Sequence, residues 1–135
     1  MQPKQTKYRK FFKPRRLPKI LSQAQKLQPY SSLTLVALES AYLTTKQIEA
    51  ARQSIRRKVK RRGTLEIHIF TDIGISRKSS TARMGKGKGK VSHWIGTATA
   101  GQTIMTLTGI PIKEGLAALR GGANKLPLKL HICGR

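Results

Sequence analysis

Apolar and polar side chains alternate, or recur at helical spacing, in several short segments of this chain. Residues 33–43 alternate, with apolar side chains on one face, which predicts a strand. Thr44 and Gln47 have the spacing of a capping box, so a helix is expected to begin at Thr44 and to stop near Gly63. One face of this helix carries an apolar stripe made of Ile48, Ala51, Ile55 and Val59.

Further strands are expected after this helix. Residues 65–70 alternate cleanly between apolar and polar side chains, as a strand with one buried face does. Two more such segments, 91–98 and 102–108, are joined at Ala100 and Gly101. A glycine in so short a connection is typical of a hairpin, so we expect these two strands to pair with each other.

The remaining segments complete the expected order of elements. Residues 71–90 are expected to form a long loop. Pro111 opens a second helix, which is expected to depend on tertiary packing because it contains several glycines. These glycines are Gly115, Gly121 and Gly122. Residues 128–132 alternate once more and predict a last short strand.

This order of elements predicts an α+β fold in which two helices pack on a mostly antiparallel sheet or sandwich. With 135 residues, the chain is expected to form one domain with a tail. We place a basic, extended N-terminal arm at residues 1–30 and a single α+β domain, which contains the long loop, at residues 31–135. No homo-oligomer is expected.

The electric charge of the chain indicates its class of partner. There are 28 Lys and Arg residues against five acids, a net charge of +23. Such a charge repels itself in the folded state unless a polyanion neutralises it. Nucleic acid is the favoured partner, because Lys and Arg release counterions from phosphates, and an anionic membrane surface is the rival. No apolar run approaches the roughly 20 residues of a membrane-spanning helix.

The N-terminal arm combines cations with aromatic residues and prolines. It is either a solvated tail or a segment that becomes ordered on RNA, with Tyr8, Phe11 and Phe12 packing on bases or on the domain. We favour the second interpretation, because a purely solvating tail gains nothing from three aromatic residues. The expected RNA-binding residues of the arm are Lys4, Lys7, Arg9, Lys10, Lys13, Arg15 and Arg16.

The second half of the first helix and the turn after it carry seven Lys and Arg residues within positions 52–62, with no acid among them. A basic helix face is often merely solvated, and cations at the C-terminal end also suit the helix dipole. So dense a run costs repulsion in water, and we therefore expect it to contact phosphates. The expected contacts are Arg52, Arg56, Arg57, Lys60, Arg61 and Arg62.

Glycine and lysine alternate near the end of the expected loop. Glycine lets backbone amides approach an anion closely and each lysine adds charge, so this segment is expected to lie extended in RNA. Its residues are Arg83, Met84, Gly85, Lys86, Gly87, Lys88, Gly89 and Lys90. A P-loop is excluded because Val91 stands where the hydroxyl is needed, and the glycine spacing does not fit the dinucleotide fingerprint.

Metal binding and catalysis find little support in the sequence. The candidate ligands are His68, His93, His131 and Cys133, and no paired set among them completes four. The five acids are scattered among 28 cations and are expected in structural ion pairs, not in acid–base catalysis. We therefore expect no catalytic residue, no metal, no cofactor and no enzymatic activity. Trp94 is expected in the core, with stacking on a base as the alternative.

Four motifs, in order along the chain, resemble the bacterial-type large-subunit ribosomal protein sixteen family. They lie at residues 2–10 (QPKQTKYRK), 43–52 (LTTKQIEAAR), 83–89 (RMGKGKG) and 125–129 (KLPLK). The resemblance implies a structural constituent of the large ribosomal subunit that binds rRNA near the aminoacyl-tRNA site and the peptidyl-transferase region. It also implies a role in subunit assembly and tRNA positioning, with aminoacyl-site tRNA and neighbouring ribosomal proteins as partners.

The chain departs from the family pattern at residues 30–33, at 71–82 and at Gly121-Gly122. These departures are typical of an organellar chain, so a mitochondrial ribosome is expected, with the plastid and the bacterial cytoplasm as alternatives. The charge would fit a non-ribosomal protein that packs nucleic acid equally well, and the motifs are what favour the ribosome. The basic helix lacks the large aromatic or Leu-rich face that membrane-surface binding needs.

Overall fold

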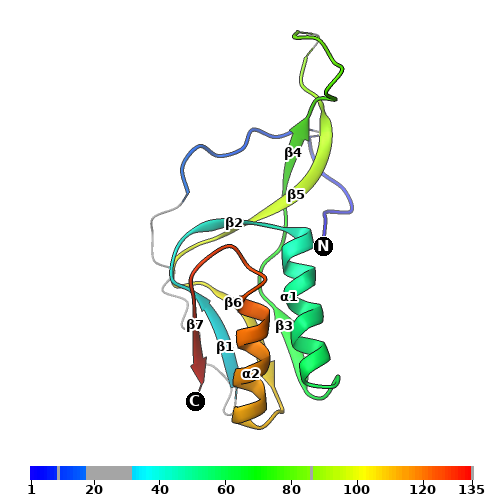
Figure 1. Cartoon of the computed structure of the whole chain (residues 1–135). Coiled ribbons are helices and arrows are strands. Elements are labelled where there is room, and N and C mark those ends of the chain that lie inside the picture. Colours follow the sequence, from blue (N-terminus) through cyan, green and yellow to red (C-terminus); the bar gives the residue numbers. More distant parts are fainter. Residues whose placement is uncertain (9, 18–31, 86, 135) are drawn as a thin grey trace.

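Two helices lie side by side over one sheet, and a long hairpin projects from the opposite end of the molecule (Figure 1). This computed structural model describes residues 1–8, 10–17, 32–85 and 87–134. The elements in chain order are β1 (Ser32–Ala37), β2 (Ala41–Thr44), α1 (Thr45–Lys58), β3 (Thr64–Ile67), β4 (Ile73–Arg77), β5 (Lys90–Ala98), β6 (Thr103–Thr108), α2 (Ile112–Ala123) and β7 (Leu130–Gly134).

The described strands form two antiparallel sheets. One has four strands in the order β3-β6-β1-β7, and the other has three in the order β2-β5-β4. The two helices pack against each other over the four-stranded sheet, and their buried Leu, Ile and Ala side chains share one core with it. The predicted α+β fold is therefore confirmed. No described helix has the length and apolar character needed to cross a membrane.

Two expectations about the strands are wrong. The predicted strand at 33–43 is two strands, because the chain turns after Ala37 and β2 joins the other sheet. The predicted pairing of 91–98 with 102–108 does not form, because β5 lies between β2 and β4 while β6 lies between β3 and β1. The turn at Gly101, where φ is 82°, carries the chain from one sheet to the other.

Two further strands have different bounds from those expected. The strand predicted at 65–70 runs from Thr64 to Ile67, although Ile69 beyond its end is buried as the alternation required. The last strand begins at Leu130 and not at Leu128, which is buried just before it. In both cases the apolar pattern predicted the buried face correctly, but it did not predict where the strand begins or ends.

The loop expected at residues 71–90 is shorter, because its first part is β4. This strand pairs with β5 and leaves residues 78–89 as the connection between the two. The strands come very close where the connection ends, since a Cβ atom on Gly89 would lie 2.5 Å from the carbonyl oxygen of Arg77. Together, β4, β5 and their connection form the projecting hairpin (Figure 1).

The first helix begins where the sequence predicts. The Thr44 hydroxyl accepts a hydrogen bond from the Gln47 amide at 3.3 Å, and the Thr44 amide donates to the Gln47 side chain at 2.9 Å. This completes the capping box. The helix ends at Lys58, well before the expected stop at Gly63. The predicted apolar stripe is fully buried and consists of Ile48, Ala51, Ile55 and Val59.

The glycines of α2, which begins after Pro111 as predicted, make room for neighbouring elements. A Cβ atom on Gly115 would lie within 2.3 Å of the Leu33 side chain, and one on Gly122 within 2.6 Å of Ile55. The missing side chain at these positions, which lowers helix propensity, is therefore what allows α2 to approach β1 and α1 closely.

Candidate nucleic-acid interface

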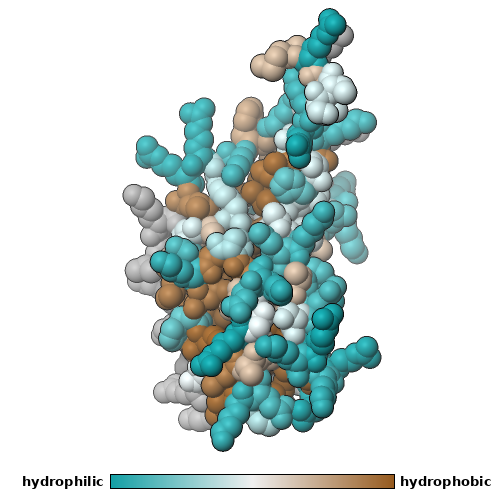
Figure 2. Space-filling model, viewed as in Figure 1, coloured by the Kyte–Doolittle hydropathy of each residue, from teal (hydrophilic) through white to brown (hydrophobic). Residues whose placement is uncertain are grey.

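Cations gather along an open groove on α1 and the turn that follows it, on a side of the molecule where Figure 2 shows mostly hydrophilic side chains. We call this groove the helix surface. It is lined by Arg52, Gln53, Arg56, Arg57, Lys60 and Arg61. The buried stripe on the other side of α1 sets the orientation of the helix, so the core holds these cations in place. Closely spaced cations of this kind suit the phosphates of a nucleic-acid backbone.

The turn after α1 holds the far end of the helix surface. Lys60 and Arg61 adopt positive φ angles of 51° and 64°, a conformation that residues with side chains rarely take. The turn is held by the Arg61 amide, which donates to the Arg56 carbonyl at 3.1 Å, and by the Arg56 guanidinium, which donates to the Gly63 carbonyl at 3.2 Å. Both Lys60 and Arg61 stay exposed, so the turn adds two cations to the groove.

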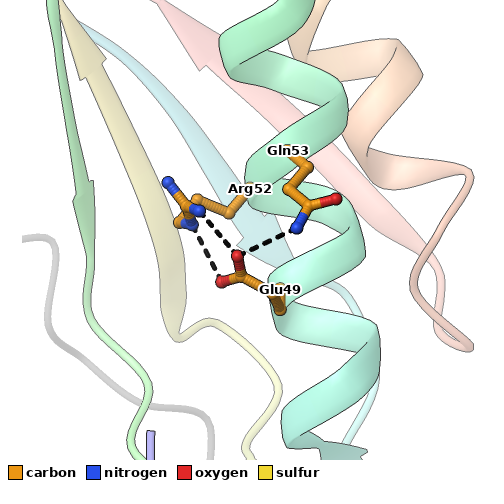
Figure 3. Close-up of polar contacts among 3 residues, drawn as sticks. All are labelled: Glu49, Arg52 and Gln53. Carbon is orange, nitrogen blue, oxygen red and sulfur yellow. Dashed lines mark hydrogen bonds and ion pairs between the residues drawn. The ribbon is translucent and has the colours of Figure 1, made fainter.

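Arg52 is paired with an acid within the same helix. Its guanidinium donates two hydrogen bonds to the Glu49 carboxylate, at 2.8 and 2.6 Å, and the Gln53 amide donates a third at 3.2 Å (Figure 3). The hydrogen bond from Arg52 is the main cause that lowers the pKa of Glu49 from 4.5 to about 2, and the same contact raises the pKa of Arg52. Glu49 therefore stays ionised and offsets one charge of the helix surface.

Lys58, the last residue of α1, and Arg62, in the turn that follows, contact α2 and do not line the groove. The Arg62 guanidinium forms an exposed ion pair with Glu114 at 2.5 Å, and the Lys58 ammonium donates to the Ala117 carbonyl at 3.1 Å. Arg62 is one of the expected RNA contacts, and a phosphate there would compete with Glu114. These two contacts tie the helices together at the exposed edge of their interface.

A second group of cations surrounds the connection between β4 and β5. We call it the tip surface, a hollow lined by Arg77, Lys78, Ser79, Ala82, Arg83, Met84, Gly85, Gly87, Lys88, Gly89 and Lys90. Gly85 and Gly87 have φ angles of 91° and 80°, with open space where a Cβ atom would lie, so the backbone conformation and not crowding requires glycine there. The Lys78 ammonium donates to the Gly85 carbonyl at 2.6 Å and bridges the connection.

The N-terminal arm is fastened to the tip surface by a reciprocal contact. The Lys10 ammonium donates to the Lys88 carbonyl at 2.5 Å, and the Lys88 ammonium donates to the Phe11 carbonyl. The same Lys88 nitrogen lies 4.1 Å from the centre of the Phe12 ring. We call these three contacts the arm–tip clasp. The clasp thus brings together two segments that are far apart in the sequence and are both expected to bind RNA, the arm and the hairpin.

The arm also packs on the three-stranded sheet. The Phe11 and Trp94 rings meet edge to face, with centroids 6.1 Å apart. The Tyr42 hydroxyl donates to the Pro14 carbonyl at 2.7 Å, and the Lys13 ammonium lies 4.7 Å from the centre of the Tyr42 ring. Trp94 is half-buried and lies under the arm. The sequence instead predicted it in the core of a hairpin.

The expected RNA-binding residues thus fall mainly into the helix surface and the tip surface, at different ends of the molecule (Figure 1). Arg9 and Lys86 lie outside the described residues. The other cations expected to bind RNA through the arm are all exposed: Lys4, Lys7, Lys10, Lys13, Arg15 and Arg16.

Two residues that shape these surfaces, Glu49 and Lys78, are not among the expected ones, and a third, Phe12, is expected to pack on a base or on the domain but is 91% exposed. Glu49 lies three positions before Arg52, a helical spacing that signals a side-chain pair. Lys78 carries no sequence signal, because its contact with Gly85 depends on the fold of the connection. Phe12 is aromatic like Phe11, and nothing in the sequence shows that only Phe11 packs on the sheet.

Histidine and cysteine form pairs and not clusters in the part of the chain that the structure describes. No group of three or more His, Cys, Asp or Glu residues lies together there. His131 Nδ1 lies 3.3 Å from Cys133 Sγ on β7, and His68, exposed just after β3, shares a 2.8 Å hydrogen bond with the Thr106 hydroxyl.

The amino-acid sequence is similar to those of known proteins along nearly its whole length. The family model described as "Ribosomal protein L16p/L10e" matches residues 3–133. The "Large ribosomal subunit protein uL16" of Erythrobacter litoralis is 40% identical to this chain over 135 residues, which is 100% of the chain and 92% of the relative. The protein of that name from Caulobacter vibrioides is 39% identical over 100% of the chain and 93% of its own length.

Proposed function

Since the chain belongs to the ribosomal protein L16p/L10e family, we propose that it is a structural, non-enzymatic constituent of the large ribosomal subunit that binds rRNA through its helix surface and tip surface. The observation that carries the proposal is that two exposed surfaces of the fold each gather closely spaced cations. A protein that only needed solubility would not concentrate its charge in this way.

The two surfaces suit different features of folded RNA. The helix surface presents a row of cations from a rigid helix, which fits a phosphate backbone running along the groove. The tip surface is narrow and rich in glycine, and it projects beyond the core, so it fits a crowded space between RNA strands. Binding at either surface releases counterions and therefore weakens as salt rises.

We assign the tip surface to the functional end of the subunit. The motif at 83–89 is the one that the sequence resemblance connects with the aminoacyl-tRNA site and the peptidyl-transferase region. The hairpin carries this motif farthest from the two-helix core (Figure 1). In this assignment the tip orders rRNA during subunit assembly and supports tRNA positioning, and neighbouring ribosomal proteins contact the remaining surface.

The proposed location is the mitochondrial ribosome, with plastid or bacterial ribosomes as the alternatives. The support is the set of departures from the family pattern, at residues 30–33, 71–82 and Gly121-Gly122. The two relatives described above come from bacteria, which is compatible with the bacterial alternative. Fractionation of cells that express the tagged full chain tests the proposal, and co-sedimentation with ribosomes outside the organelles would contradict the mitochondrial location.

The RNA-binding proposal is tested by the salt dependence of affinity for a large-subunit rRNA transcript. The wild-type chain is expected to show a log–log slope of several units. The pair Arg57→Ala and Arg61→Ala should reduce that slope by up to about 2, since each phosphate contact contributes roughly 0.7–0.9. Lys113→Ala, at the exposed start of α2, is the matched control and should change the slope little.

Two outcomes would contradict this function. A wild-type chain that ignores rRNA at low ionic strength would remove its basis. Equal affinity for random duplex DNA and for rRNA would instead favour a protein that packs nucleic acid without ribosomal specificity.

A further inference from the structure

The aromatic residues at the start of the chain have unequal environments. Phe11 packs edge to face on Trp94 and lies 3.4 Å from where a Cβ atom of Gly74 would be, so it anchors the arm on the three-stranded sheet. Phe12, its neighbour, is 91% exposed. A ring this exposed gains no stability from burial, which is the usual contribution of an aromatic side chain to a fold.

The exposed ring is nevertheless held in place. Lys88 Nζ lies 4.1 Å from the ring centre and also donates to the Phe11 carbonyl, next to the ring in the chain. The Lys10 ammonium in turn donates to the Lys88 carbonyl at 2.5 Å. The arm–tip clasp thus ties the arm to the hairpin just before Phe12 in the chain and places a cation against the ring, which leaves the rest of the ring in solvent. A ring held in this way loses little conformational entropy when it binds a ligand.

The surroundings of this ring indicate the chemistry of its ligand. Lys10 and Lys13 flank Phe12 in the sequence and are exposed, and Lys88 adds a third cation from the tip surface. A flat apolar face among cations matches a nucleotide, because the base stacks on the ring while its phosphates meet the ammonium groups. A protein partner would place an apolar side chain beside three cations, which is a poorer match.

We propose that Phe12 and Lys88 form a stacking site for one unpaired nucleotide of RNA, with Phe12 as the platform and Lys88 as the group that holds the ring. The site rests on the proposed rRNA binding but goes beyond it, because it adds a base contact to surfaces that otherwise recognise phosphates. It also gives the arm–tip clasp a role, since the clasp joins the platform to the hairpin that enters the RNA.

The test uses the full chain and two RNA probes of about ten nucleotides, a single-stranded oligoadenylate and a blunt RNA duplex. Phe12→Ala and Phe12→Leu should each weaken binding of the single strand roughly 5- to 100-fold and leave binding of the duplex unchanged. Ile112→Ala removes a comparable exposed apolar side chain at the start of α2 and should have no effect. The salt slope should be unchanged in all three variants, because no charge is removed.

A second variant gives a signal that does not depend on affinity. Phe12→Trp should bind the single strand at least as well as the wild-type chain, and its added fluorescence should be quenched on binding. The wild-type chain, in which Trp94 is the only tryptophan, supplies the background signal.

The outcomes separate this inference from the proposed function. If the wild-type chain binds rRNA with a steep salt slope but the Ala and Leu variants bind the single strand as well as it does, the stacking site is overturned and the function stands. Phe12→Leu with wild-type affinity, beside a weakened Phe12→Ala, would also overturn the stacking site. An apolar side chain without a π-face would then be enough for binding, which is typical of a contact with a protein and not with a base. Failure of the wild-type chain to bind any RNA would instead remove the proposed function.

Discussion

At position 49 the chain keeps one of its five acids beside its densest run of cations. The Glu49 carboxylate is partly exposed and accepts hydrogen bonds from Arg52 and Gln53. An exposed pair of this kind stabilises a helix by only about 0.3–0.5 kcal/mol. Its larger effect concerns binding, because it offsets one positive charge of the helix surface and fixes the Arg52 side chain.

The stability contributed by Glu49 should depend on pH in one direction. Its pKa is lowered on folding, from 4.5 to about 2, so its contribution is complete above pH 4.5 and is lost as the pH falls through about 2. Glu49→Gln is therefore expected to lower the free energy of unfolding by about 0.5 kcal/mol at neutral pH and by less in acid. Denaturant unfolding of both proteins across this range checks the prediction, and a difference that grows toward low pH would contradict it.

The same substitution should strengthen RNA binding. Releasing Arg52 from Glu49 adds one cation that can meet a phosphate, so Glu49→Gln should steepen the salt slope for rRNA by up to about 1. Glu66→Gln removes an exposed acid from β3 and serves as the matched control for net charge alone. Equal changes in the two variants would mean that Arg52 does not contact RNA.

Among the elements, α2 shows why a helix with three glycines is still a good fit to this fold. Gly115 and Gly122 are buried where Leu33 of β1 and Ile55 of α1 need their space, whereas Gly121 meets only the flexible end of Lys58. Helix propensity and packing therefore act in opposite directions at the two buried positions. At Gly121 they do not conflict.

Gly122→Ala is expected to destabilise the protein by about 1–3 kcal/mol despite the better helix propensity of alanine. The added Cβ atom would lie 2.6 Å from two carbons of the fully buried Ile55. Gly121→Ala, its control, should be neutral or stabilising by up to about 1 kcal/mol, because Lys58 can move aside. Thermal or denaturant unfolding measures both, and destabilisation by Gly121→Ala equal to that by Gly122→Ala would contradict the packing argument.

The arm–tip clasp is one of two sets of contacts that join the arm to the folded unit, the other being its packing on the three-stranded sheet. Lys88→Ala removes one hydrogen bond and one cation–π contact, each worth about 1 kcal/mol, so chymotrypsin should cleave after Phe11 and Phe12 roughly 5- to 30-fold faster. Lys90→Ala, the next lysine of the same alternating run, is the control and should leave the rate unchanged. Equal rates in both variants would show that the clasp does not hold the arm.

Local patterns predicted α1 well, because its capping box and apolar stripe are both properties of adjacent turns. The pairing of β5 could not be predicted in the same way. A glycine near its end indicates a turn, but only the global fold decides that β2 and β4, and not β6, become its neighbours. The strand β4 was missed for the same reason, since its short Ile-Gly-Ile-Ser-Arg segment needs β5 as a partner to form a strand.

For the whole molecule, the sequence predicted where charge lies but not how it is arranged in space. The positions of Arg57 and Lys88 in cationic runs were evident, whereas the separation of the two surfaces at different ends of the fold follows only from the topology. The partial neutralisation by Glu49 and Glu114 likewise depends on side-chain contacts. A net charge of +23 on a small core favours unfolding in dilute buffer, so RNA should stabilise the folded chain.

Photo-crosslinking inside assembled large subunits tests whether the helix surface and the tip surface both contact rRNA. A photoreactive amino acid is placed in the full chain at Arg57 of the helix surface, at Met84 of the tip surface, or at Lys113 as a control. We expect rRNA crosslinks from the first two positions, to two separate segments of large-subunit rRNA, and far fewer from the third. Subunits that contain the protein but show no rRNA crosslinks from Arg57 and Met84 would contradict this expectation.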